Sequence, residues 1–334
     1  MIPRKTRKRT ACALLCLALV LLVSCKSNPK QSELTQINVA CFPNITHAQA
    51  LLLKGQGTLE QAFAQDGVKV NWITFNAGPS EIEALFAGEV DIGYIGPVPA
   101  VSGYIQSGGD LFVIAGASNG GSVLVARDGA GIRSAGDLDG RTVAIPQFGN
   151  TQHLSLLALL TANGLKPTTG GGTVSVVQSS NADVANLMDR GNIDAALVPE
   201  PWGSILELNG DGQVVLDYDR VDPNGIPSTA VVIVRKDFLD AHPDAVARFM
   251  QAHKDATAAI NDDPETAMAV INAQITEITQ KPIGDDVLAS AFRRLQISYE
   301  IPLSSIMDFA GIGVDENLLA GLPDKNLTND TFVR

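Results

Sequence analysis

The sequence predicts an α/β fold built as two lobes, and three observations support that prediction. Short apolar runs alternate with segments of helical spacing, as in sheets of largely parallel strands. About 310 residues follow an N-terminal targeting segment, which is more than one ordinary core organises. Residues 88–93 (Gly-Glu-Val-Asp-Ile-Gly) are echoed at residues 191–196 (Gly-Asn-Ile-Asp-Ala-Ala). So short a match also arises by chance, but it favours two equivalent units.

The first 24 residues have the pattern of a secretory signal. Five basic residues at positions 4–9 precede an uncharged run from Thr10 to Ser24, which is too short to span a bilayer comfortably. Ser24 directly before Cys25 resembles the bacterial lipobox, in which the cysteine becomes the lipidated N-terminus. An ordinary signal peptide with an incidental cysteine is the alternative. We predict lipidation of Cys25 and an extracytoplasmic protein anchored to the membrane by acyl chains.

Composition is informative once this segment is set aside. The whole chain carries 24 basic and 36 acidic residues, and without residues 1–24 it carries 19 and 36, a net charge of −17. Such an acidic protein is a poor ligand for nucleic acid or for an anionic bilayer. Cys41 would be the one cysteine left besides Cys25, so we expect no intramolecular disulfide.

The expected elements follow the alternation in chain order. Strands are expected at residues 37–40, 68–75, 90–95, 111–115, 122–126, 142–145, 173–177, 193–198 and 229–234. Helices are expected at residues 47–65, from 78 onward, and at 152–163, 181–190, 243–260, 264–274 and 285–295. We therefore divide the chain into a signal peptide (1–24), a polar tether (25–36), the first part of lobe 1 (37–122), lobe 2 (123–227), and the return to lobe 1 with C-terminal helices (228–334).

An ordered set of short motifs resembles the aliphatic sulfonate/taurine/nitrate-binding family of ABC-importer substrate-binding proteins. The motifs lie at residues 57–60, 72–79, 88–91, 137–144 (Asp-Leu-Asp-Gly-Arg-Thr-Val-Ala) and 149–150, within a similarity spanning residues 37–260. The resemblance implies a two-lobed type II periplasmic-binding fold with a hinge and an interlobe ligand cleft. It also implies a monomer that delivers its solute to membrane permease and ATPase subunits.

Ligands of open α/β sheets bind beyond the carboxyl ends of the strands, so six loops should line the cleft. They are residues 42–47, 76–80, 96–99, 118–121, 147–153 and 199–203, and none contains Lys or Arg. We therefore expect an anion to be held by helix N-terminal N–H groups, hydroxyls and amides. The alternative is that these residues only cap helices. The candidate ligand-binding residues are Asn44, Thr46, His47, Gly78, Ser80, Pro97, Ser118, Asn119, Gly149, Asn150, Thr151, His153, Glu200 and Trp202.

Glu200 and Trp202 are candidates for contacting the end of the solute that does not carry the anionic group. A carboxylate in the cleft would attract an amine, and Trp202 could cover a methylene or enclose a cation. Taurine, with a sulfonate and an ammonium group, would satisfy both halves of such a cleft. The alternative is that Glu200 faces solvent and Trp202 fills the lobe interface.

Other chemistries have weaker support. His47, His153 and Glu200 could meet as a metal site, but they lack a ligand-spacing motif, and we predict no metal and no cofactor. The His-Glu-x-x-His motif and a phosphate-cradling Walker loop are absent from the sequence, and Cys41 has no obvious partner, so we predict a binding protein rather than an enzyme. Nitrate, bicarbonate or a nitrogenous nutrient remain alternative solutes, and an enzyme or sensor on the same fold remains the alternative class.

Overall fold

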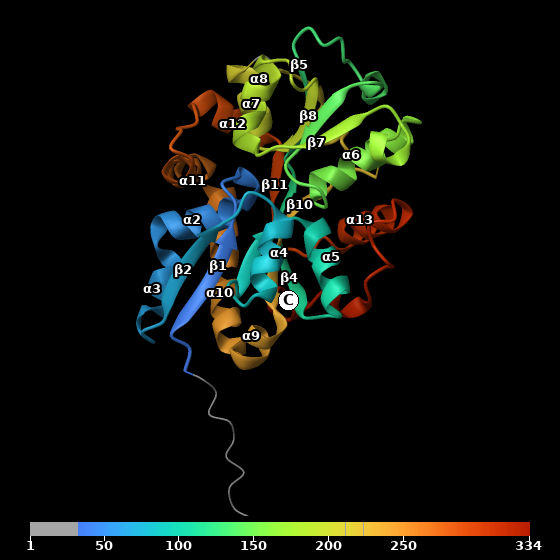
Figure 1. The fold of residues 1–334 in the computed structure, drawn as a ribbon. Helices are drawn as coiled ribbons and strands as arrows, with labels where there is room; N and C mark the ends of the chain where they lie inside the picture. The colour runs from blue at the N-terminus through green and yellow to red at the C-terminus, as the bar shows by residue number, and fades with distance from the viewer. Residues whose placement is uncertain (1–32, 211, 223) are drawn as a thin grey trace, which may run out of the picture. The chain divides into compact units, whose positions relative to one another are not determined.

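The computed structural model describes residues 33–210, 212–222 and 224–334, and residues 35–334 form one compact unit (Figure 1). The predicted signal peptide and Cys25 lie outside the described residues. Within the described part, no helix has both the length and the apolar character needed to cross a membrane.

The first sheet has six strands in the order β11-β4-β10-β3-β1-β2. Its strands are β1 (Gln36–Cys41), β2 (Lys69–Thr74), β3 (Ile92–Ile95), β4 (Leu111–Gly120), β10 (Ser228–Arg235) and β11 (Leu295–Ile297). β1 pairs in parallel with β2 and β3, whereas β10 is antiparallel to both β3 and β4, and β11 is antiparallel to β4.

The second sheet has five strands in the order β7-β6-β8-β5-β9. They are β5 (Ser122–Arg127), β6 (Thr142–Ile145), β7 (Ser175–Gln178), β8 (Ala195–Pro199) and β9 (Gly212–Leu216). β6 pairs in parallel with β7 and β8, whereas β5 is antiparallel to β8 and β9. Each sheet thus contains an antiparallel strand that enters directly from the other sheet, β5 after β4 and β10 after β9, and the first sheet has β11 as a second antiparallel strand. The sequence predicts strands at both crossing positions but not their antiparallel direction.

Helices cover both sheets. They are α2 (Ala48–Gln56), α3 (Thr58–Ala64), α4 (Gly78–Phe86), α5 (Pro97–Ser107), α6 (Thr151–Ala162), α7 (Val184–Asp189), α8 (Trp202–Asn209), α9 (Lys236–Ala241), α10 (Pro243–Asp262), α11 (Pro264–Thr279), α12 (Asp285–Arg293) and α13 (Leu303–Asp315). The helix expected at 47–65 is two helices, because Gly57 adopts a left-handed φ of 63° between α2 and α3. The sequence patterns do not predict α5, α8, α9, α13, β9 or β11.

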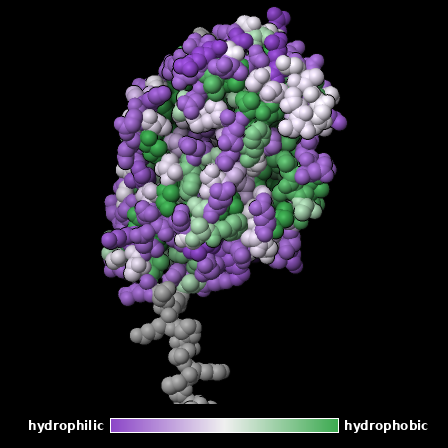
Figure 2. Space-filling model, viewed as in Figure 1, coloured by the Kyte–Doolittle hydropathy of each residue, from purple (hydrophilic) through white to green (hydrophobic). Residues whose placement is uncertain are grey.

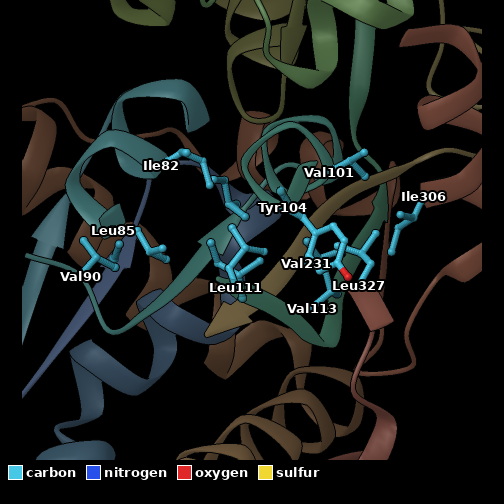
Figure 3. Packing of buried hydrophobic residues seen from close by; sticks show 14 of the residues in the cluster. Ile82, Leu85, Val90, Val101, Tyr104, Leu111, Val113, Val231, Ile306 and Leu327 are labelled. Atoms are coloured by element: carbon cyan, nitrogen blue, oxygen red, sulfur yellow. The ribbon is translucent and has the colours of Figure 1, made fainter. Parts of the chain in front are cut away.

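Each sheet is packed between apolar layers. In the first sheet, Leu111, Val113 and Val231 pack against side chains of α4, α5 and α13 (Figure 3). In the second sheet, one cluster of buried side chains involves α6 and another involves α7 and α8. On the face drawn in Figure 2, hydrophilic residues cover most of the surface and hydrophobic residues show in a few patches.

The internal echo corresponds to equivalent joints in the two sheets. Asp91, just before β3, accepts a hydrogen bond from the backbone N–H of Asn38 (2.8 Å) and pairs with Arg235 at the end of β10 (2.7 Å). Asp194, just before β8, accepts from the N–H of Thr142 (3.0 Å) and pairs with Arg127 at the end of β5 (3.3 Å). The two aspartates therefore have equivalent roles. Asp91 links β10 to β1, and Asp194 links β5 to β6.

A buried ion-pair cluster joins the C-terminal helices to the second sheet. The Arg294 guanidinium follows α12, directly before β11 of the first sheet. It donates to Glu200 Oε1 (2.9 Å), to the Ser204 hydroxyl (2.9 Å) and to Glu207 Oε2 (2.8 Å), all in or beside α8. It also donates to Asp217 Oδ1 (2.9 Å), between β9 and β10. Arg294 thus connects the first sheet to the second beside the crossing segments.

We predict that Arg294→Met lowers the free energy of unfolding by about 3–5 kcal/mol, because it leaves the buried Glu200 carboxylate without a counterion. Arg293→Gln, at the exposed neighbouring position, should change stability by less than about 0.5 kcal/mol. The double variant Glu200→Gln/Arg294→Met should recover part of the loss. Urea unfolding measures all three, and an Arg294→Met variant as stable as Arg293→Gln would contradict this role.

Candidate functional site

A cavity lies where the carboxyl ends of the parallel strands of both sheets meet. It encloses about 350 Å³, including space open to solvent. Loops after β1, β2 and β3 line it from the first sheet, and loops after β6, β7 and β8 line it from the second. The lining residues are Phe42, Asn44, Thr46, His47, Asn76, Ala77, Gly78, Gly96, Pro99, Pro146, Asn150, Thr151, Gln152, Asn181, Pro199 and Thr229.

The cavity lining carries no formal charge. Among the described residues that form it there is no Lys, Arg, Asp or Glu. Glu81, in the first turn of α4, is fully buried, and burial raises the pKa of its carboxyl well above the ordinary range. Burial therefore favours the neutral form of this carboxyl, which weakens its repulsion of an anion near the start of α4.

Hydrogen-bond donors converge on the cavity from two helix N-termini. α4 begins after Ala77, which has no capping side chain, so the N–H groups of Gly78 and Ser80 have no partner inside the helix. α6 begins after Asn150, whose Oδ1 accepts from the N–H of His153 (2.8 Å) and leaves the first-turn N–H groups of Thr151 and Gln152 free of intrahelical bonds. Such N-termini favour anions through their N–H groups and their dipoles.

Thr151 adds a side-chain donor to this set. Its hydroxyl is buried without a hydrogen-bond partner, and the residue is only 4% exposed. Gly96 of the opposite sheet approaches it so closely that a Cβ on Gly96 would lie 2.2 Å from Thr151 Oγ1. A buried hydroxyl without a partner costs free energy, and a ligand oxygen in the cavity would remove that cost.

His47 is a neutral donor in the cavity. Its Nδ1 accepts from the N–H of Phe42 (3.2 Å), so the ring proton resides on Nε2. Burial lowers the pKa of His47 to about 3. The imidazole can thus donate a hydrogen bond to a solute but contributes no charge at neutral pH.

The structure places six of the candidate residues in the cavity lining: Asn44, Thr46, His47, Gly78, Asn150 and Thr151. Four others support that lining. Ser80 hydrogen-bonds Gln147 across the lobes (3.4 Å), and Ser118 donates to the carbonyl of Thr46 (2.8 Å). Gly149 precedes Asn150 and donates its N–H to Nδ1 of His153 (3.1 Å), whose pKa burial lowers to about 4.

Four candidates lie elsewhere, and the predictions for them need correction. Pro97 begins α5 behind Gly96, and Asn119 pairs with β11, so neither lines the cavity. Glu200 is 0% exposed and binds Arg294, so its carboxylate is not free for a solute amine. Burial raises the pKa of Glu200, while the Ser204 N–H and Arg294 act against that rise. Trp202 lines a neighbouring cavity, and its indole N–H donates to Asn44 Oδ1 (2.8 Å) across the lobes.

Three lining residues lie outside the six expected loops: Pro146, Asn181 and Thr229. Asn181 follows β7, so the rule of strand carboxyl ends could have found it. Thr229 comes from the antiparallel strand β10, which no local pattern marks as facing the cleft. His253 of α10 is fully buried between the Tyr94 hydroxyl (2.8 Å) and the Gly116 carbonyl (2.9 Å).

The described residues contain no group of three or more His, Cys, Asp or Glu side chains placed to bind a metal ion. His47 lines the cavity, whereas His153 packs edge-on against Phe148, with ring centroids 5.2 Å apart. The arrangement of the lining suits reversible binding of an anionic group through neutral donors.

We predict that Thr151→Val weakens binding of ethanesulfonate about tenfold or more, because it removes a donor to a charged group while keeping the side-chain volume. Thr168→Val, at an exposed position of the same lobe, should leave the affinity unchanged. Isothermal titration calorimetry measures both variants. Equal affinity in Thr151→Val and the unsubstituted protein would refute a direct contact.

We predict that ethanesulfonate affinity stays constant between pH 8 and pH 5.5. An ordinary imidazole has a pKa near 6.5 and would gain a proton in this window, which would strengthen anion binding as the pH falls. The pKa of His47 is lowered to about 3, so its ring stays neutral throughout. A tenfold rise in affinity on acidification, measured by titration calorimetry, would show that a charged group holds the anion.

The sequence and the fold are similar to those of known binding proteins. The chain is 36% identical over 192 residues to the taurine-binding periplasmic protein of Escherichia coli (strain K12), covering 57% of each chain. It therefore spans less than two thirds of that relative's length. The alkanesulfonate-binding protein SsuA from Xanthomonas axonopodis pv. citri bound to MOPS superposes with a TM-score of 0.73 at 20% identity, over 89% of this chain and 97% of that one.

The periplasmic nitrate-binding protein NrtA from Synechocystis PCC 6803 has the same fold, with a TM-score of 0.66 at 16% identity over 86% of this chain and 83% of that one. The model of the NMT1-like family matches residues 30–275, which is more than half of the chain. This two-lobed α/β protein with its uncharged interlobe cavity belongs to the NMT1-like family.

Proposed function

We propose that this chain is the extracytoplasmic solute-binding subunit of an ABC importer and that it closes on a small organosulfur solute such as an aliphatic sulfonate or taurine. The observation that carries the proposal is the uncharged cavity with donors from α4, α6, His47 and the unpartnered Thr151 hydroxyl. A sulfonate spreads its charge over three weakly basic oxygens, so several neutral N–H and O–H donors can hold it without a countercharge. The taurine-binding and alkanesulfonate-binding proteins to which the chain is similar support this choice.

The proposal extends to the cellular location of the protein. Cleavage before Cys25 and lipidation of that residue would tether the binding unit to the membrane, where permease and ATPase subunits receive the solute. The polar segment that follows Cys25 suits such a tether. A binding role rather than an enzymatic one agrees with the named relatives.

Asn181 replaces Glu200 as the candidate contact for a taurine amine. Its Oδ1 lies buried in the cavity without a hydrogen-bond partner. An amide oxygen can accept an ammonium proton without adding charge to the cavity. A zwitterion with no net charge would therefore fit this neutral lining.

The test of the proposed function is thermal unfolding of the purified protein with taurine, ethanesulfonate, nitrate and bicarbonate. A solute at about 100 times its dissociation constant stabilises the folded state by roughly 2.7 kcal/mol, which gives a clear shift in Tm. Sulfonates should stabilise the protein and the other two anions should not. Stabilisation by nitrate or bicarbonate alone would replace the proposed solute class.

We also predict that Asn181→Leu weakens the binding of taurine at least fivefold more than the binding of ethanesulfonate, since only taurine presents an ammonium group to this side chain. Asn209→Leu on α8 is the matched control, because that residue lines the neighbouring cavity alone. Equal losses for the two solutes in Asn181→Leu would exclude the amine contact.

A further inference from the structure

A second cavity adjoins the anion cavity and has a different character. It encloses about 780 Å³, including space open to solvent, between the start of α7, α8 and the end of α11. Its walls are mainly aliphatic or aromatic, with Ala182, Ala185, Ile205, Ile275, Ile283 and Trp202 among them, and its one charged member among the described residues is Lys281, an exposed residue. We call it the side chamber. Such walls suit an apolar group better than a second ionic head.

Two features connect the side chamber to the anion cavity. Asn181 lines both, and its buried Oδ1 is unpartnered. Trp202 lines the side chamber, while its indole N–H holds Oδ1 of Asn44, which lines the anion cavity. Asn181 and the Trp202–Asn44 hydrogen bond thus link the linings of the two cavities.

The opposite side of the anion cavity is closed more tightly. There, Pro99 packs directly on Gly78, since a Cβ on Gly78 would lie 2.2 Å from Pro99 Cγ. Ser80 and Gln147 bond across the lobes on that side. A cavity beyond this seam, lined by Pro79 and Phe148, shares one described residue with the anion cavity, as the side chamber does, but that residue is Pro99, which is packed on Gly78 and carries no side-chain polar group.

We propose that the side chamber binds the organic chain of the solute while the sulfonate group occupies the anion cavity. This inference rests on the proposed function and deepens it, because it assigns specificity for chain length to Asn181, Ala185 and Trp202. The preferred solutes are then unbranched alkanesulfonates longer than ethanesulfonate. Their methylene groups extend past Asn181 and are removed from water where they pack beside Trp202. Each buried methylene strengthens binding about fourfold, which corresponds to ~0.8 kcal/mol.

The experiment is titration calorimetry with ethane-, butane- and hexanesulfonate. In the unsubstituted protein, affinity should rise about fourfold per methylene. Ala185→Phe fills the side chamber, so it should abolish this rise while ethanesulfonate affinity stays within twofold. Ala182→Phe, at an exposed position of the same wall, should do the same and covers the case in which Ala185→Phe fails to fold. Ala258→Phe, on an exposed position of α10, is the matched control and should keep the full rise.

Trp202 gives an independent reading in a Trp72→Phe background, because Trp72 and Trp202 are the only tryptophans of the chain. Its fluorescence should shift to shorter wavelength with hexanesulfonate and remain unchanged with ethanesulfonate. Two results would overturn the role of the side chamber and leave the proposed function intact. One is an affinity that does not change with chain length while ethanesulfonate still binds. The other is an affinity that still rises with chain length in both Ala185→Phe and Ala182→Phe. If no sulfonate binds the unsubstituted protein, the proposed function fails and this inference fails with it.

Discussion

The ion pair between Arg294 and Glu200 is the constraint on which the site depends. Glu200 directly follows β8, at the carboxyl end of a parallel strand, where a free carboxylate would repel an anionic solute. Arg294 holds it away from the cavity and also binds Glu207 and Asp217, which joins the C-terminal helices to the second lobe. One guanidinium therefore pairs with the carboxylate nearest the cavity loops and connects the segments that cross between the sheets.

The neutral cleft follows from that arrangement. Helix N-termini, a buried hydroxyl and a neutral imidazole supply the donors, and the acidic residues of the part that the structure describes lie outside the lining. Such a site recognises an anion through geometry, because each donor must reach an oxygen at hydrogen-bond distance. It also tolerates a solute with no net charge, which a site built on Arg or Lys would bind less well.

Much of the fold could be predicted from the sequence, because its elements leave local patterns. The apolar strands, the internal echo and the loops at strand carboxyl ends led to Asn44, Thr46, His47, Gly78, Asn150 and Thr151. Contacts between distant segments leave no such pattern. Arg294 lies 94 positions from Glu200 and ends a helix whose sequence resembles an ordinary surface helix. The helix α5 was hidden because Pro97 and Pro99 look like loop residues, although proline fits a first helical turn.

The central claim is that an anion is held in this cavity by neutral donors alone. A crystal structure of the protein with ethanesulfonate tests it most directly. The account predicts sulfonate oxygens within hydrogen-bond distance of the N–H groups at the starts of α4 and α6 and of the Thr151 hydroxyl, with the Arg294–Glu200 pair unbroken. A sulfonate bound to the Arg294 guanidinium, with Glu200 displaced, would contradict it.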